Sequence, residues 1–267
     1  MPIETPEFIT SFKNPKIQMV RELLASRNSR EEHSACIVEG VRLSEEAVRS
    51  GVLPDTILFT DELSARGMAL LRTIPSGKTT FIKIPPDLMR KVSATEADQG
   101  LMLIIPLQSN PIIGKVDFVL ILDQIMDPGN LGTILRTASA AGAQAVIIAP
   151  GCVDPFSPKV LRSGMGAHFN IPIATLTWPE ISEFCQRSGN ALAICLAESS
   201  AGTSMWTMDL RQPIAIIIGS EADGASEEAK RVASMVINIP MPGGSESLNA
   251  SIAAGILLYE VVRQRSQ

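Results

Sequence analysis

The first 107 residues alternate between helical and strand-like spacings of apolar positions. Apolar residues three and four apart predict helices at 16–27 and 41–51, because this spacing places them on one helix face. Short apolar runs predict strands at 35–40, 56–60 and 100–107. We therefore expect residues 1–107 to form a small α/β domain.

A polar stretch with turn-forming residues separates two apolar regions. LQSNPIIGK (107–115) contains Ser, Asn, Pro and Gly, which predicts a linker at 108–114. Beyond it, helical patterns alternate with five strand-like runs, DFVLILDQ, AVIIAP, ALAICLA, PIAIIIG and VINIP, up to a long final helix. Continuously apolar runs of this kind are typical of a parallel sheet covered by helices on both faces. The sequence therefore predicts a second α/β domain at 115–267.

The charge balance limits where a nucleic acid could bind. The chain has 267 residues, 45% of them hydrophobic, and a net charge of -5. Residues 1–110 carry 13 Lys and Arg against 14 Asp and Glu, and residues 111–267 carry 10 against 14, so neither half is basic. A phosphate-binding surface must then be a local patch. The only dense basic run comprises Lys13, Lys16, Arg21, Arg27 and Arg30. A solvated helix face explains this run equally well.

Cysteines and histidines give no metal-binding pattern. The four cysteines (Cys36, Cys152, Cys185 and Cys195) form no C-x-x-C pair, and neither His33 nor His168 stands at a metal-ligand spacing. The first residues lack the pattern of a signal peptide, and no apolar run approaches the roughly 20 residues of a membrane span. We expect a cytoplasmic protein with reduced thiols, no metal and no membrane partner.

Ligands of a parallel α/β sheet bind beyond the carboxyl ends of the strands, which directs attention to three loops. In DQIMDPGNLGTILRTASAAG (123–142), Pro128-Gly129 predicts a turn and Asn130 is placed to cap the following helix. Arg136 follows six residues later, and a helix N-terminus beside a guanidinium could hold a phosphate. A capped helix with one surface arginine is an equally good interpretation.

The other two loops have the same ambiguity. In IIIGSEADGAS (216–226), glycines allow a close approach to a ligand, and Glu221 is either a site carboxylate or a residue that complements a helix start. In IPMPGGSESLNASIAAGILLYE (239–260), Ser247 or Asn249 could be a helix cap, and the small residues could serve close helix packing. No loop decides the function alone.

Several common enzyme classes lack their motifs here. The chain has no G-x-G-x-x-G after its first strand and no G-x-x-x-x-G-K-[ST], which disfavours NAD binding and P-loop chemistry. It has no G-x-S-x-G, and His168 is better interpreted as a packing residue than as a base. Trp206 and Tyr259 have core or interface interpretations as good as any functional one.

Taken together and in this order, the three loops resemble the SpoU (TrmH-type) RNA ribose methyltransferases of the SPOUT superfamily. The family's first motif is similar to Asn130-x-Gly132 followed by Arg136, and its second to Gly219-x-Glu221-x-x-Gly224. Its third motif is similar to Ile239-Pro240-Met241 followed by Ser247-Leu248-Asn249. The segment 151–172 also resembles the family's linking segment, so the resemblance covers about residues 115–265.

The N-terminal half is similar to the substrate-binding domain that often precedes this catalytic domain. ACIVEGVRLSEEAVRSG and ATEADQGLMLIIP carry this likeness to a ribosomal-protein-like RNA-binding fold. The domain implies structured RNA, most often ribosomal RNA, as the substrate. Two alternatives stay open: a tRNA 2′-O-methyltransferase, and a non-catalytic RNA-binding or assembly factor that keeps the fold. The intact motif residues favour an enzyme.

The resemblance implies a parallel-sheet catalytic domain with a trefoil knot, an exception to the rule that chains are unknotted. It also implies a homodimer whose site is completed by the second subunit. The activity implied is methyl transfer from S-adenosylmethionine to a ribose 2′-OH, which RNA has and DNA lacks, with no metal required. The donor-binding positions implied are Ala197, Gly219, Ile239, Met241 and Leu248.

The same resemblance assigns roles to five catalytic-site residues. Arg136 would hold the RNA phosphate and position the ribose, because a guanidinium with a pKa above about 12 stays protonated; a role as base stays open. Asn130 would orient Arg136 or the sugar, and Glu221 would fix a guanidinium by a charge-assisted pair. Ser247 and Asn249 would hold the third loop and contact donor or substrate.

Overall fold

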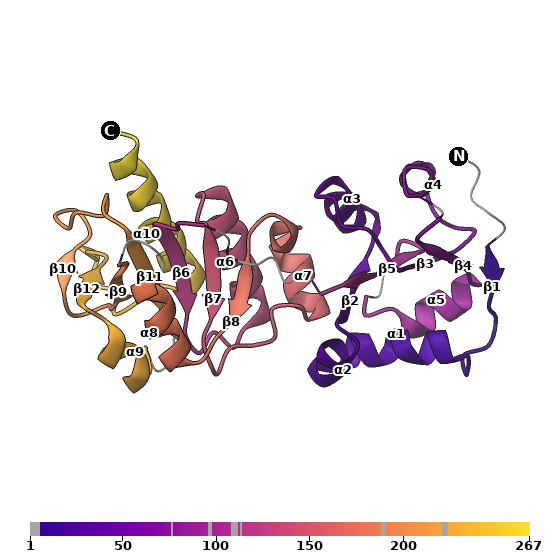
Figure 1. The fold of residues 1–267 in the computed structure, drawn as a ribbon, viewed down its shortest axis with the longest axis horizontal. Coiled ribbons are helices and arrows are strands. Elements are labelled where there is room, and N and C mark those ends of the chain that lie inside the picture. Colours follow the sequence, from indigo (N-terminus) through magenta and orange to yellow (C-terminus); the bar gives the residue numbers. More distant parts are fainter. Residues whose placement is uncertain are drawn as a thin grey trace. The chain divides into compact units, whose positions relative to one another are not determined.

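A computed structural model of the chain describes residues 6–75, 77–95, 98–107, 112, 114–187, 191–220 and 224–267. These residues belong to two compact units (Figure 1). Unit 1 comprises residues 1–108 and 156–169, and unit 2 comprises 109–155 and 170–267. Most of the predicted linker at 108–114 lies outside the described residues, so the domain boundaries stay predictions.

Unit 1 is built on a mixed five-stranded sheet with the order β1-β4-β3-β5-β2. Its strands are β1 (Glu7–Phe8), β2 (Ala35–Glu39), β3 (Thr56–Phe59), β4 (Thr80–Lys83) and β5 (Leu101–Pro106). Its helices are α1 (Pro15–Ala25), α2 (Arg27–Glu32), α3 (Val41–Arg49), α4 (Ala65–Leu71), α5 (Pro86–Val92) and α7 (Pro158–Gly164), with the 3-10 helix η1 (Ala167–Phe169). β1 and β3 run parallel to β4, whereas β5 runs antiparallel to β2 and β3.

Both faces of this sheet are buried, which explains the continuous apolar run at 100–107. Leu101, Leu103 and Ile105 join one apolar cluster, and Met102 and Ile104 join another on the opposite face, as the alternation of side chains along a strand requires. The predicted small α/β domain is confirmed as a fold.

The segment 156–169 is far along the chain but belongs to unit 1. Its helix α7 contacts β2, and Leu161 and Phe169 are buried in the same cluster as Leu101 and Leu103. His168 in this segment is 1% exposed, with its ring 5.8 Å from that of Phe156, so its interpretation as a packing residue is confirmed. Through this segment, unit 1 completes its core with residues that follow the first strands of unit 2.

Unit 2 is built on a seven-stranded, entirely parallel sheet with the order β10-β12-β9-β11-β6-β7-β8. Its strands are β6 (Phe118–Leu122), β7 (Ala145–Ile148), β8 (Ile173–Thr175), β9 (Ala193–Ala197), β10 (Thr203–Ser204), β11 (Ile214–Ile218) and β12 (Met235–Asn238). Its helices are α6 (Pro128–Ala140), α8 (Trp178–Arg187), α9 (Glu227–Val232) and α10 (Ala250–Arg265).

Helices cover both faces of this sheet. Alternate residues of β6, Val119 and Ile121, pack in one cluster with Ile181 of α8 and Ala229 of α9. The opposite face is covered by α6 and α10, which pack against each other. The predicted parallel α/β architecture is confirmed, and the trefoil knot stays a prediction. None of the described helices is both long and apolar enough to cross a lipid bilayer.

Candidate active site

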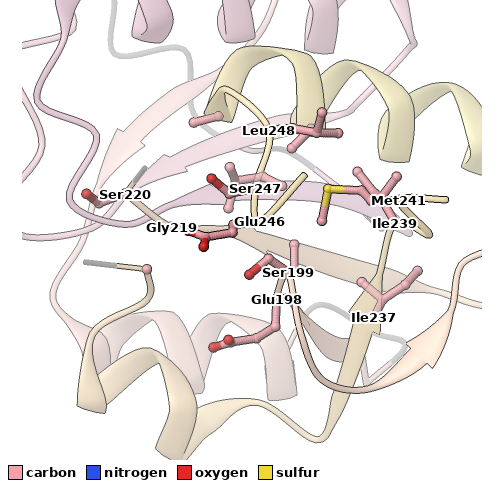
Figure 2. A pocket seen from close by; sticks show the side chains of 15 residues that line it. Glu198, Ser199, Gly219, Ser220, Ile237, Ile239, Met241, Glu246, Ser247 and Leu248 are labelled. Atoms are coloured by element: carbon pink, nitrogen blue, oxygen red, sulfur yellow. The ribbon is translucent and has the colours of Figure 1, made fainter. Parts of the chain in front are cut away.

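A cavity of about 340 Å³ lies where three loops of unit 2 meet, beyond the carboxyl ends of β9, β11 and β12 (Figure 2). Because β12, β9 and β11 are adjacent parallel strands, the loops that follow them emerge at one edge of the sheet. The loop before α10 closes the cavity with Ser247 and Leu248. All five predicted donor-binding residues line it, namely Ala197, Gly219, Ile239, Met241 and Leu248.

The loop after β11 approaches the cavity through its backbone. A Cβ on Gly219 would stand 2.8 Å from the backbone of Gly224 and Ala225, closer than non-bonded atoms allow. The backbone N–H of Ser220 donates to the carbonyl oxygen of Gly224 at 3.0 Å, which holds these two residues together. Gly219 is therefore required by close packing, and the cavity wall here is main chain.

The lining chemistry suits a cationic, partly apolar ligand. Ile239, Met241 and Leu248 give apolar surface, and Figure 2 shows Ser247 and Glu246 between them and Gly219. Its described lining contains two carboxylates, Glu198 and Glu246, and no Lys or Arg. Such a cavity attracts a positive charge and disfavours a polyphosphate. S-adenosylmethionine, with its adenosine, sulfonium and ammonium groups, fits a cavity lined by these apolar and acidic residues.

Sequence reasoning did not name Glu198, Ser199, Ser220 or Glu246, which also line the cavity. Glu198 and Ser199 directly follow the strand-like run ALAICLA. The rule that ligands bind beyond the carboxyl ends of parallel strands could have identified them.

Two predicted residues 119 positions apart in the sequence are joined by a hydrogen bond. Asn249 Nδ2 donates to Asn130 Oδ1 at 3.1 Å. Asn249 is also the N-cap of α10, because its Oδ1 accepts from the backbone N–H groups of Ser251 and Ile252 at 3.0 and 3.3 Å. The cap and site interpretations of Asn249 therefore both apply, and this residue links α10 to α6.

The prediction that Asn130 caps α6 is wrong. The N-cap is Asp127, whose Oδ1 accepts from the backbone N–H of Asn130 at 2.8 Å. Pro128 occupies the first helical position, which its fixed φ angle favours, so the helix begins before Asn130. Asn130 consequently lies in the first helical turn, where its side chain reaches Asn249.

The other three predicted catalytic residues, Ser247, Arg136 and Glu221, are not brought together in the described part of the structure. Ser247 lines the cavity. Arg136 lies on α6 with an exposed side chain, does not line the cavity, and makes no hydrogen bond or ion pair with any described residue. Glu221 lies outside the described residues. Within the parts of the chain that are described, no three His, Cys, Asp or Glu side chains are grouped to hold a metal ion.

The basic run of unit 1 divides into exposed and buried side chains. Lys13 is exposed, Lys16 pairs with Glu7, and Arg27 pairs with Glu31. The Arg21 guanidinium lies 4.5 Å from the centre of the Phe12 ring. Arg30 is only 4% exposed, and its guanidinium donates to the carbonyl oxygen of Leu23 at the end of α1. Arg30 therefore caps a helix and does not offer its charge to a phosphate.

Two aromatic residues with ambiguous roles are exposed. Trp206 is 64% exposed and Tyr259 is 50% exposed, so their interpretation as core residues is wrong.

Comparison with known proteins gives matches over both units. Residues 117–259 match the SpoU rRNA Methylase family, and residues 14–103 match the MRM3-like substrate binding domain. The chain is 32% identical over 268 residues to the 23S rRNA (uridine(2479)-2′-O)-methyltransferase of Streptomyces viridochromogenes, covering 96% of this chain and 92% of the relative. It is 30% identical over 256 residues to the 23S rRNA (guanosine(2553)-2′-O)-methyltransferase RlmP of Bacillus subtilis, covering 95% and 98%.

A solved structure has the same fold over nearly the whole chain. The SpoU methyltransferase AviRb from Streptomyces viridochromogenes, in complex with the cofactor AdoMet, aligns with a TM-score of 0.86 and 31% identity. The alignment covers 95% of this chain and 99% of that one. The likeness thus extends over both units.

Proposed function

This chain belongs to the SpoU rRNA methylase family, and from this membership we propose that it methylates a ribose 2′-OH of ribosomal RNA with S-adenosylmethionine as donor. The observation that carries the proposal is the cavity after β9, β11 and β12, where the family's donor-binding positions meet around a negatively charged lining. Ribosomal RNA is favoured because relatives that match the whole chain, substrate-binding domain included, are named for 23S rRNA.

The cavity residues bind and orient the donor. Bound there, S-adenosylmethionine supplies a methyl group on a positively charged sulfur. Glu246 of the cavity lining stabilises this positive charge, and the main chain at Gly219 forms part of the wall against which the donor lies. Ser247, at the cavity wall, contacts the donor or the sugar that receives the methyl group.

The motif residues on α6 and α10 position the RNA. Arg136 offers an exposed guanidinium that can hold a phosphate by two parallel hydrogen bonds. Since a guanidinium stays protonated, its main effect is to place the ribose rather than to remove the 2′-OH proton. The bond between Asn249 and Asn130 fixes the third loop to the first turn of α6, and Glu221 is assigned to pair with a guanidinium.

A methylation assay with competing RNA classes tests the proposal. The protein is incubated with methyl-labelled donor and either ribosomal RNA or tRNA, and labelled nucleosides are identified after digestion. We expect 2′-O-methylnucleosides from ribosomal RNA. Label confined to tRNA would replace the proposed substrate. A protein that binds no donor by calorimetry would instead be the non-catalytic assembly factor.

We assign RNA phosphate contacts to Lys13, Lys16, Arg21 and Arg27 of unit 1, whose charges are at least partly exposed. The logarithm of the binding constant for RNA falls as the logarithm of the salt concentration rises. In the double variant Lys13→Ala/Arg21→Ala this fall is expected to be less steep, by about 1 for each phosphate that is no longer neutralised. Binding is measured by filter retention at several salt concentrations. Arg49→Ala, which removes an exposed arginine of α3, is the matched control and should keep the wild-type slope. An unchanged slope in the double variant would make this run a solvated helix face.

We also propose that the protein is a homodimer. Ile252 and Tyr259 are 54% and 50% exposed, and with partly exposed Ile256 they form an apolar stripe along α10, beginning next to the Asn249 cap. Because this stripe is unusual on a surface, we place the contact with a second copy here, where the partner can complete the RNA side of the site.

The proposed cytoplasmic location is consistent with four free cysteines.

Ile252→Glu is expected to separate the two subunits. A charge buried in an apolar contact costs several kcal/mol, so the dimer dissociation constant should rise about 100-fold or more. Sedimentation velocity over a concentration series measures this change. Leu53→Glu, at an exposed apolar residue of unit 1, is the control. A monomeric wild type, or an Ile252→Glu variant that dimerises normally, would contradict the assignment.

A further inference from the structure

Asp123 is a buried carboxylate outside the donor cavity. It directly follows β6, its side chain is 0% exposed, and it does not line the donor cavity. Its Oδ2 accepts a hydrogen bond from the backbone N–H of Ser226 at 2.7 Å. Its Oδ1 has no hydrogen-bond partner among the residues that the structure describes. Burying an ionisable group with an unsatisfied oxygen is costly, so the bond that it does make needs an explanation.

Asp123 bonds to both ends of the loop that follows β11. Its backbone N–H donates to the carbonyl oxygen of Ile218 at 2.9 Å, just before the loop begins. Its carboxylate holds Ser226, where the loop ends and α9 begins. Gly219, Ser220 and Gly224, between these two bonds, line the donor cavity. One residue that follows β6 therefore fixes the ends of a loop that contributes to the cavity wall.

The backbone around Asp123 is itself held in an uncommon conformation. Gln124 has a φ of 55°, which lies in the left-handed region that non-glycine residues rarely adopt. Cys152 brackets it, since its Sγ donates to the carbonyl oxygen of Leu122 at 3.2 Å and accepts from the N–H of Ile125 at 3.3 Å. Strain of this kind persists when the surroundings fix the geometry, and it is common at functional sites.

We propose that Asp123 is a positioning residue for the methyl donor: by holding Ser226, it sets the main chain of Gly224 beside Gly219 at the cavity wall and thereby controls donor affinity. This inference rests on the proposed function, because it takes S-adenosylmethionine as the ligand. A carboxylate makes a stronger bond to a backbone N–H than a neutral amide does, which explains why an acid stands here. The pKa of Asp123 is raised, chiefly by burial and also by the charge of Glu228, although the backbone and the side chain of Ser226 lower it.

The test compares Asp123→Asn and Asp123→Ala with the wild type. Asparagine keeps an acceptor for the Ser226 N–H, whereas alanine removes it. We expect the Kd for S-adenosylmethionine, measured by calorimetry, to rise about 10-fold or more in Asp123→Ala and by a smaller factor in Asp123→Asn, as for the loss of a charge-assisted bond. At saturating donor, kcat and the KM for RNA should stay within about twofold of wild type, which a general loss of structure would not allow.

Ser226→Ala is the matched control. It removes the side-chain cap of α9, whose Oγ accepts from the N–H of Ala229 at 3.1 Å, but it keeps the backbone N–H that Asp123 holds. Because it also removes the Ser226 side-chain interaction with Asp123, this variant should melt at a lower temperature and should weaken donor binding less than Asp123→Ala does. The inference is overturned by a folded Asp123→Ala variant with the wild-type Kd, or by an equal loss of affinity in Ser226→Ala. A wild type that binds no donor would instead overturn the proposed function.

Discussion

Arg136→Ala is expected to lower kcat/KM for methylation of RNA by about 100- to 1,000-fold, the loss typical of removing one group that stabilises or positions the reacting centre. The structure indicates that the substitution should not destabilise the fold. The side chain is exposed on α6, does not line the donor cavity, and has no bonding partner among the described residues. Its removal should therefore leave the unfolding free energy within about 0.5 kcal/mol of wild type.

Three measurements separate the roles that Arg136 could have. Steady-state methylation gives the loss of rate, calorimetry should give an unchanged Kd for S-adenosylmethionine, and thermal unfolding should be unchanged. Arg136→Lys keeps a positive charge but lacks the planar fork, so partial activity would support phosphate holding. Arg187→Ala on α8 is the matched control, because Arg187 is also an exposed arginine of unit 2. Equal methylation by Arg136→Ala and wild type would remove this residue from the chemistry.

The second large effect is expected at Gly219. In Gly219→Ala the new Cβ would stand 2.8 Å from main-chain atoms of Gly224 and Ala225, so these atoms must move away from Gly219. Overpacking of this kind costs about 1–3 kcal/mol, which corresponds to a rise in the donor Kd of about 5- to 160-fold if the whole cost falls on the bound state. Calorimetric titration with S-adenosylmethionine measures it.

Gly243→Ala is the matched control for Gly219→Ala. Gly243 belongs to the loop before α10, but a Cβ added there meets nothing within 4 Å. The two variants add the same methyl group near the same cavity, and only the one at Gly219 should weaken donor binding. Similar Kd values for both variants would show that the close approach at Gly219 does not shape the donor site.

The parts of this fold that can be predicted are those that follow from local patterns of apolar residues in the sequence. The continuously apolar runs that became β6, β7, β9, β11 and β12 identified a sheet buried on both faces, since local hydrophobicity reflects burial directly. The long final helix, Ala250–Arg265, was expected for the same reason. Motif spacing then pointed to the loops at one edge of the sheet, because strand direction determines where loops emerge.

The errors arose where tertiary contacts outweigh local signals. Asn130 and Asp127 are both good cap residues, and only the start of the helix at Pro128 decides between them. Arg30 stands in a basic run, but its guanidinium is buried against the end of α1. Nothing local distinguishes it from Arg27, which is on the surface. The bond between Asn130 and Asn249 depends on two helices that meet only in the folded chain.

The segment 156–169 has a consequence for how such proteins diversify. It supplies Leu161 and Phe169 to the core of unit 1, although it follows β6, α6 and β7 of unit 2 in the sequence. Unit 1, which matches the MRM3-like substrate binding domain over residues 14–103, is therefore not a continuous N-terminal module. A chimera that exchanged only the residues before the linker would combine the unit 1 sheet of another protein with the original α7 of this chain. An exchange of unit 1 in this chain must transfer two separated stretches together, so a change in its substrate range is expected to arise by substitution within unit 1 more readily than by domain exchange.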